Sequence, residues 1–540
     1  MNLPRTSLRL EPSFPALALA TTLSMLSLSS IDAAPAAAQE HPVLGELEMG
    51  PHPVGFTVEY TRDPSRVERP EVRPDGTPET RPIARLMQVA LWYPASDAAS
   101  GTAMTLGDYI DLQNSGLLAD DRRDEGILTE TQRAELVREW ATWNIMTGVA
   151  LEDWERLLPV RMRASRDAVP AGGAFPLILM IQGANGSVAD MMGTAEYLAS
   201  HGYVVVTAPS RGPDQAVTRV SADPRLTESI MQDAEYAIGR AATRDFVAVR
   251  QLGVLGWSRG GTAALLLGMR NPSIDAIVSF DSGLGRLAAV APSFDPSRLT
   301  APVLAFHTGW PGPTYPPLDS LRYADVHIVP VSGVHHVDFS AIGMIHTALH
   351  ARNRHVTASD EHIRSAHEWI NRYTLLFMDA RVKQDERAVA RFEKIAYGDA
   401  GEGAPSDILT VATRAGRPAP PAAGHLAELV WRRGGIGEAA GLIRAARDAD
   451  PEWLPFPEQL LNAAGYRFME LGRHDEAIGV LRLNVELYPE SANVYDSLGE
   501  ILMLTGDREG AIENYSRSLA LDPTNTNARR LLRTLTEESD

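Results

Sequence analysis

The fold is decided by the stretch Gln251-Leu252-Gly253-Val254-Leu255-Gly256-Trp257-Ser258-Arg259-Gly260-Gly261-Thr262-Ala263-Ala264. Its first five residues form a short apolar run, which is typical of a strand buried on both faces. The small residues from Gly260 onward favour the start of a tightly packed helix. Between them lies G-x-S-x-G, with Ser258 at the centre. A serine in a strand-to-helix turn, with glycine on each side, is typical of a catalytic nucleophile.

Further apolar runs surround this stretch and alternate with helical patterns. The sequence predicts strands at 175–181, 202–208, 251–255, 274–280, 301–306 and 326–331, and helices ending near 200 and at 228–242, 260–269 and 362–379. Alternation of this kind indicates a mostly parallel sheet with helices on both faces. We therefore expect an α/β, doubly wound fold.

A serine hydroxyl is a weak nucleophile unless a neighbouring base takes its proton. In the order serine, acid, histidine, the base follows the last core strand. His336 is the predicted base, with the adjacent His335 as the alternative. The acid must accept from the other ring nitrogen. Asp281, at the end of the strand at 274–280, is the predicted acid, and Asp319 is the alternative.

The negative charge that develops on the substrate oxygen needs two backbone N–H donors. One belongs to the residue after the nucleophile, which is Arg259. The other comes from the loop after the strand at 175–181, where Ala184 fits best. Gly183 and Gly186 allow that backbone to approach closely. We expect Ala184 and Arg259 to form the oxyanion hole.

The first 38 residues are typical of a secretory signal. Arg5 and Arg9 precede an apolar stretch, and Ala36-Ala37-Ala38 fits a small-residue cleavage site. The sequence thus predicts export, to a periplasm or out of the cell, with no stable membrane span after the signal is removed. Residues 39–397 form the predicted catalytic domain. Within it, the helix-prone segment of about 104–165 breaks the alternation and is interpreted as a helical insertion.

Residues 425–540 carry a repeat of 34 residues. Gly472 and Gly506, Ala477 and Ala511, and Pro489 and Pro523 are each separated by that step. This region resembles the tetratricopeptide-repeat family, which implies stacked helix pairs. Two roles stay open: a docking platform for a peptide or protein partner, or a structural appendage. The stretch 398–424, rich in Gly, Pro and Ala, is the predicted linker.

Composition excludes several classes of protein. The 540 residues include no cysteine, so disulfides, Cys-ligated metals and a thiol nucleophile are excluded. The net charge is −19 without a long basic run, which argues against nucleic acid as a partner.

Residues from about 53 to 392 resemble the α/β-hydrolase superfamily, in the branch of platelet-activating-factor acetylhydrolases and dienelactone-hydrolase-like esterases. The resemblance is carried by Asp63-Pro64-Ser65-Arg66, by Leu91-Trp92-Tyr93-Pro94-Ala95, by the spacing of Ser258, Asp281 and His336, and by His336-Val337-Asp338-Phe339. It favours Asp281 over Asp319. The chain departs from this branch at Gln182-Gly183, where His-Gly is usual. It also lacks the cysteine that dienelactone hydrolases proper use.

Together these features predict an exported serine hydrolase that cleaves small carboxylic esters through an acyl-enzyme, without metal or organic cofactor. Two alternatives remain. One is a prolyl-oligopeptidase-like serine peptidase, because such enzymes share the G-W-S-x-G-G elbow. The other is an inactive hydrolase-fold scaffold whose repeats bind a protein partner.

Overall fold

The computed structural model describes residues 41–68, 82–118, 151–213, 224–282, 294–308, 316–350, 358–397 and 411–537. The predicted signal, residues 1–38, lies outside these residues, as does part of the predicted insertion, residues 119–150.

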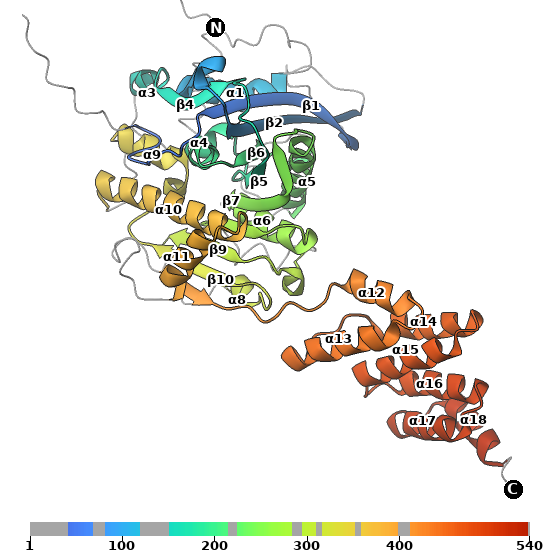
Figure 1. Ribbon diagram of the computed structural model, residues 1–540. Helices are drawn as coiled ribbons and strands as arrows, with labels where there is room; N and C mark the ends of the chain where they lie inside the picture. Colours follow the sequence, from blue (N-terminus) through green and yellow to red (C-terminus); the bar gives the residue numbers. More distant parts are fainter. Residues whose placement is uncertain are drawn as a thin grey trace, which may run out of the picture. The chain divides into compact units, whose positions relative to one another are not determined.

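One mixed sheet organises the N-terminal part of the molecule (Figure 1). Its order is β11-β10-β9-β8-β7-β5-β6-β2-β1-β4-β3. The strands from β10 to β6 run parallel, whereas β2 pairs antiparallel with both β6 and β1. The bounds are β1 Val54–Glu68, β2 Ile83–Pro94, β3 Thr102–Thr105, β4 Arg161–Arg166, β5 Phe175–Ile181, β6 Val204–Ala208, β7 Val247–Trp257, β8 Ala276–Phe280, β9 Val303–Thr308, β10 Val326–Val331 and β11 Ala412–Arg414. The predicted α/β fold is therefore present.

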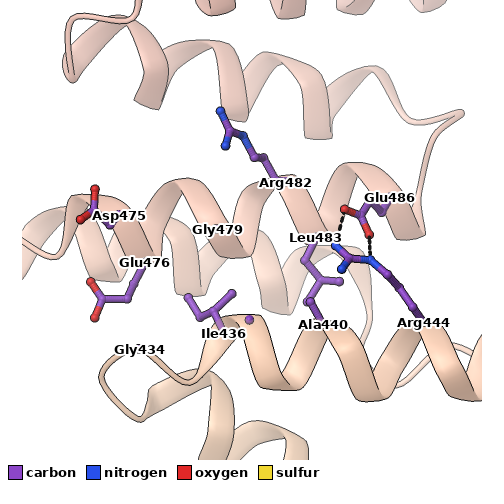
Figure 2. A pocket seen from close by; sticks show the side chains of 11 residues that line it. Gly434, Ile436, Ala440, Arg444, Asp475, Glu476, Gly479, Arg482, Leu483 and Glu486 are labelled. Atoms are coloured by element: carbon purple, nitrogen blue, oxygen red, sulfur yellow. Dashed lines mark hydrogen bonds and ion pairs between the residues drawn. The ribbon is translucent and has the colours of Figure 1, made fainter.

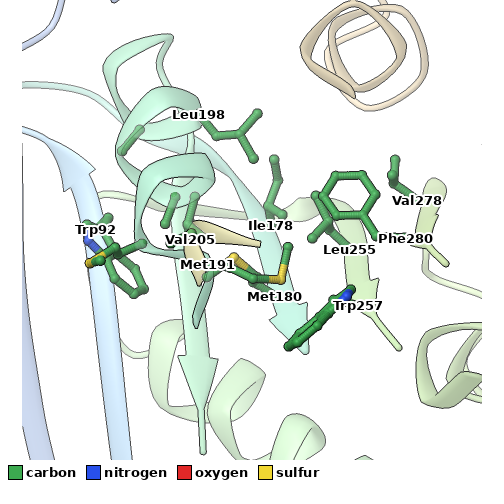
Figure 3. Close-up of a cluster of buried hydrophobic side chains, with 14 of the residues drawn as sticks. Trp92, Ile178, Met180, Met191, Leu198, Val205, Leu255, Trp257, Val278 and Phe280 are labelled. Atoms are coloured by element: carbon green, nitrogen blue, oxygen red, sulfur yellow. The ribbon is translucent and has the colours of Figure 1, made fainter. Parts of the chain in front are cut away.

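Helices cover both faces of the sheet. On one face lie α4 (Met192–Ser200), α9 (Ala341–Ala348) and α10 (Asp360–Arg381), and on the other α5 (Pro224–Ala241) and α6 (Arg259–Arg270). Because successive strand residues face opposite sides, Ile178 and Met180 of β5 join one apolar core and Leu177 and Leu179 the other. Figure 3 shows part of the first core, where Trp92 and Leu255 are buried.

Chain order places the predicted site at one edge of the sheet. From β5 the chain passes to β6 on one side, and then returns to β7 on the other side of β5. A crevice forms at such a reversal, outside the carboxyl ends of the strands. The loop after β5 and the turn after β7 both lie there.

The segment of about 104–165, predicted as a helical insertion, also contains strand residues at both ends. Met104 belongs to β3, and β4 pairs parallel with β1 and antiparallel with β3. In β4, Met162 and Ala164 are buried, whereas Arg161 and Arg163 are exposed and Arg166 is half-buried, so the two faces of this strand differ. The segment does contain helices α1 (Leu106–Leu118) and α3 (Leu151–Leu157). Tyr109 of α1 is fully buried.

The linker predicted at 398–424 also contributes to the fold. Its described part contains β11, which pairs antiparallel with β10 at the end of the sheet. Arg414 donates to the carbonyl oxygens of Leu318 and Leu321, both at 2.7 Å. A strand of three residues is too short to show a hydrophobic pattern, so this Gly- and Pro-rich sequence did not predict it.

The C-terminal region is helical. Its elements are α11 (Glu386–Tyr397), which still packs on the sheet domain, and then α12 (Ala423–Trp431), α13 (Ile436–Ala449), α14 (Glu458–Glu470), α15 (His474–Leu487), α16 (Ala492–Leu504), α17 (Arg508–Leu521) and α18 (Thr526–Glu537). Between α13 and α15 lies a hollow of about 470 Å³ (Figure 2), where Arg444 and Glu486 form an ion pair at one end and Asp475 lies at the other. No helix within the described ranges combines the length and the apolar character needed to cross a bilayer.

Helix α4 carries a buried carboxyl group that ties it to β4. Glu196 accepts hydrogen bonds from the backbone N–H groups of Arg163 and Ala164 and from the hydroxyl of Tyr109. The Trp92 indole donates to the same hydroxyl at 2.7 Å. Burial raises the pKa of Glu196 to about 7, against the hydrogen bonds, which lower it.

This buried carboxyl predicts a pH-dependent stability. Between the ordinary pKa of glutamate and about 7, the folded chain retains a proton that the unfolded chain releases, so stability falls as pH rises through that window. The loss amounts to up to about 3 kcal/mol. Denaturation gives the unfolding free energies of the natural chain and of Glu196→Gln. The difference between these two free energies should therefore change by this amount between pH 4.5 and pH 8. Parallel pH profiles would contradict the assignment.

A second prediction concerns the helix pairs. A Cβ on Gly465 would lie 2.6 Å from Cγ of Leu481, whereas nothing lies within 4 Å of one on Gly441. Gly465→Ala should lower the unfolding free energy by about 1–3 kcal/mol through overpacking. Gly441→Ala, the matched control within α13, should raise it by up to about 1 kcal/mol through helix propensity. Denaturation followed by circular dichroism measures both, and equal effects would argue against close packing of α14 on α15.

Candidate active site

Ser258 occupies a strained turn between β7 and α6. Its φ of 57° and ψ of −121° lie where non-glycine residues are rare. Its N–H donates to the carbonyl of Phe280 at 2.8 Å, which fixes the turn against β8. A Cβ on Gly256 would overlap the carbonyl of Gly260, and one on Gly260 would overlap the carbonyl of Ile181. The two flanking glycines are therefore required by backbone packing.

Three predicted side chains form a hydrogen-bonded chain. Nε2 of His336 lies 2.9 Å from Oγ of Ser258, and Nδ1 lies 2.5 Å from Oδ2 of Asp281. His336 stands at the start of a short 3-10 turn, His336–Phe339, after β10. Its side chain is 38% exposed, while that of Asp281 is 16% exposed. A substrate can thus reach the serine and the histidine, while the carboxylate is shielded.

The carboxylate of Asp281 has further partners. Thr308, the last residue of β9, donates to Oδ1 through its N–H at 2.9 Å and through its hydroxyl at 3.2 Å. Burial opposes ionisation, but the hydrogen bonds from His336 and Thr308 outweigh it, so the pKa of Asp281 is lowered. The group is therefore ionised at neutral pH and can hold the histidine with its proton on Nδ1.

The alternative residues lie in other positions. Asp319 is exposed at the end of the short helix α8 (Pro316–Asp319), and His336 contacts Asp281 instead. His335 uses its backbone N–H to donate to Asp338 at 2.6 Å. Its Nδ1 is buried and has no hydrogen-bond partner among the described residues. The catalytic roles of Ser258, Asp281 and His336 stay predictions.

The predicted oxyanion loop lies against the serine. A Cβ on Gly183 would come within 3.0 Å of the Trp257 ring and 3.5 Å of Cβ of Ser258. The next residue, Ala184, is exposed. Arg259 is the first residue of α6, so its backbone N–H belongs to the first turn of that helix. This arrangement is compatible with both residues donating to one substrate oxygen.

Two further residues contact the site but were not predicted to do so. Trp257 donates through its indole N–H to the carbonyl of His336 at 3.1 Å, and the two rings stack with centroids 5.3 Å apart. Trp257 thereby restrains the histidine. Thr308 could have been found from its place at the carboxyl end of β9, where catalytic groups collect. The contact of Trp257 depends on a loop almost 80 residues away and has no local signal.

Within the described ranges, no group of three or more His, Asp or Glu side chains lies together in a way that could hold a metal ion.

Part of the sheet domain is similar to a known family. The model of the dienelactone hydrolase family matches residues 164–310, which include Ser258 and Asp281 but end before His336. This match supports an ester hydrolase with an α/β core. No curated protein matches the sequence.

Among solved structures, a ferulic acid esterase from Streptomyces cinnamoneus is similar. It shares 19% identity, and the alignment covers 62% of this chain and 92% of that chain with a TM-score of 0.42.

The two candidate acids can be separated by matched variants. Asp281→Asn removes the negative charge that stabilises His336, so kcat for an ester should fall about a thousandfold to ten-thousandfold. Asp319→Asn changes an exposed carboxylate and should leave kcat within about twofold. Steady-state kinetics of both purified variants measures this. A larger loss in Asp319→Asn than in Asp281→Asn would reverse the assignment.

Proposed function

We propose that this protein is an exported serine hydrolase that cleaves small carboxylic esters through an acyl-enzyme. The observation that carries the proposal is the hydrogen-bonded chain from Asp281 through His336 to the hydroxyl of Ser258. The match to the dienelactone hydrolase family supports the ester as substrate class.

In this mechanism Oγ of Ser258 attacks the ester carbonyl carbon while Nε2 of His336 takes the hydroxyl proton. The N–H groups of Ala184 and Arg259 hold the resulting oxyanion. His336 then protonates the leaving alkoxide, which departs as the alcohol and leaves an ester on Ser258. Water, deprotonated by His336, attacks this ester. His336 then returns that proton to Oγ of Ser258 as the carboxylic acid leaves.

The surroundings of Asp281 support these catalytic roles. Asp281 is shielded, ionised and fixed by Thr308, so it can orient His336 and stabilise its protonated form. Trp257 holds the backbone of His336 from the other side.

The proposal extends to both ends of the chain. Export rests on the pattern of residues 1–38.

The repeat assignment is supported by the helix bounds, because α14 and α16, and likewise α15 and α17, start and end 34 residues apart. Gly465 packs on Leu481 just as Gly499 packs on Tyr515, again one repeat later. The hollow between α13 and α15 is a candidate surface for a peptide of a partner protein.

The central test is Ser258→Ala. With the nucleophile removed, kcat for a short p-nitrophenyl ester should fall at least about ten-thousandfold. The melting temperature should fall little or rise, because alanine loses only the hydroxyl. Ser282→Ala, which removes a nearby hydroxyl hydrogen-bonded to Ser279, serves as the control and should retain turnover. Undiminished hydrolysis by Ser258→Ala would rule out the proposed nucleophile.

A further inference from the structure

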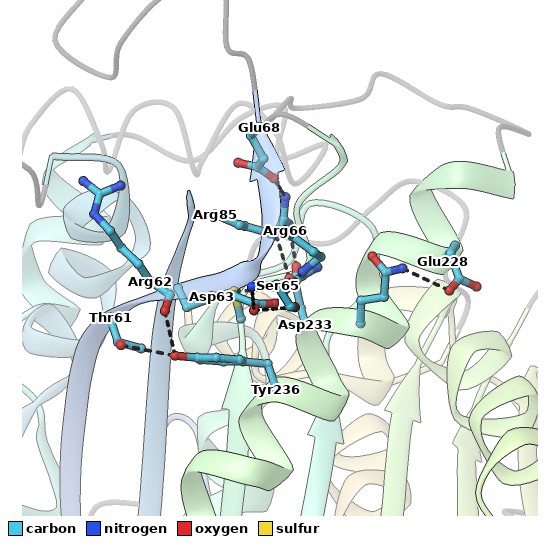
Figure 4. Close-up of polar contacts among 12 residues, drawn as sticks. Thr61, Arg62, Asp63, Ser65, Arg66, Glu68, Arg85, Glu228, Asp233 and Tyr236 are labelled. Carbon is cyan, nitrogen blue, oxygen red and sulfur yellow. Dashed lines mark hydrogen bonds and ion pairs between the residues drawn. The ribbon is translucent and has the colours of Figure 1, made fainter. Parts of the chain in front are cut away.

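A cluster of charged side chains lies where the β1–β2 ribbon meets α5 (Figure 4). It contains Asp63, Arg66, Glu68, Arg85 and Asp233. Arg85 is 2% exposed, and the three carboxylates are each buried. Charged groups are seldom buried unless they are paired and hydrogen-bonded, and the proposed reaction uses none of them.

Arg85 uses all five of its N–H donors. Nε and Nη2 donate to the two oxygens of Asp233, at 2.6 and 2.5 Å, and Nη1 donates to Glu68. The remaining two donors reach backbone carbonyls: Nη1 that of Gly212 at 3.0 Å, and Nη2 that of Arg211 at 3.2 Å. The carboxylates therefore fix the guanidinium, and the guanidinium fixes the loop that follows β6.

The motif Asp63-Pro64-Ser65-Arg66 shapes this arrangement. The pairing of β1 with β2 passes from Asp63–Arg85 directly to Val67–Ala84, so residues 64–66 form a bulge. Asp63 accepts from the N–H and hydroxyl of Ser65 and from Nε of Arg66 at 2.7 Å. Arg66 also lies 2.7 Å from Asp233. The bulge thus turns a second guanidinium onto the carboxylate that holds Arg85.

The loop after β6 is in turn bonded to the predicted oxyanion loop. Ser210 donates through its N–H to the carbonyl of Gly186 at 3.0 Å and through its hydroxyl to the carbonyl of Gln182 at 2.9 Å. These two carbonyls bracket Ala184. One continuous path of hydrogen bonds and covalent links therefore connects Arg85 with the loop that would donate to the oxyanion.

We propose that Arg85 is a positioning residue for ester hydrolysis, which holds the loops after β6 and β5 so that the N–H of Ala184 meets the developing oxyanion. This inference rests on the proposed function. An interaction realised in the transition state affects kcat more than KM, so the loss of Arg85 should appear in kcat.

Arg85→Lys and Arg66→Lys form a matched pair. Each keeps the charge of the same buried cluster, but only Arg85 touches the carbonyls of the loop. Lysine has three donors and no planar fork, so it cannot serve both carboxylates and both carbonyls. Arg85→Lys should lower kcat about tenfold to a hundredfold, with a smaller change in KM. Arg66→Lys should change kcat less than about threefold. Equal losses of kcat in the two variants, or an unchanged kcat in Arg85→Lys, would overturn the proposal.

Hydrogen exchange gives a readout that does not need turnover. Amides of residues 182–190 should exchange faster in Arg85→Lys than in Arg66→Lys or the natural chain, and unchanged exchange would contradict the proposal. Should the natural chain hydrolyse no ester, the proposed function fails while this measurement still decides whether Arg85 holds the loop. If Arg85→Lys does not fold, Ser210→Ala breaks the same path. Faster exchange and a lower kcat in that variant would support the proposal, and unchanged values would refute it.

Discussion

The backbone turn at Ser258 is the constraint on which the site depends. Its φ of 57° is held because β7 ends against β8, through the hydrogen bond from Ser258 to Phe280, and because α6 starts immediately afterwards. Gly256 and Gly260 leave no room for a side chain in this turn. Strain of this kind persists only where the surrounding structure enforces it. In this turn the strained backbone places the hydroxyl of Ser258 at the edge of the sheet, within hydrogen-bond distance of His336.

The parallel strands supply the other groups at the same edge. The loop after β5 brings Ala184, the end of β8 brings Asp281, β9 ends in Thr308, and the segment after β10 brings His336. Asp281 itself has a φ of 42°, so the acid, like the nucleophile, sits in backbone that the fold must hold in place. Polar groups contributed by four strand ends therefore converge without being neighbours in the sequence. The charged cluster around Arg85 extends this organisation to the loop after β6.

The sequence predicted the parallel core well, since strands buried on both faces are continuous apolar runs. The expected strands at 175–181 and 326–331 have the same bounds as β5 and β10. Strands β4 and β11 were missed, because β4 is half exposed and arginine-rich and β11 has only three residues. Ser258, His336 and Asp281 could be proposed because their order along the chain follows from the topology. The contacts of Trp257 and Arg85 could not, because they join segments far apart in the sequence without a local pattern.

Catalysis as proposed here requires that His336 activate the hydroxyl of Ser258. A fluorophosphonate transfers its phosphonyl group to the oxygen of an activated serine and releases fluoride. The natural chain can therefore be treated with such a probe and the modified residue located by peptide mass mapping. We expect a single adduct, on Ser258, formed in step with the loss of ester hydrolysis. An adduct on a different residue, or full loss of hydrolysis with Ser258 unmodified, would contradict it.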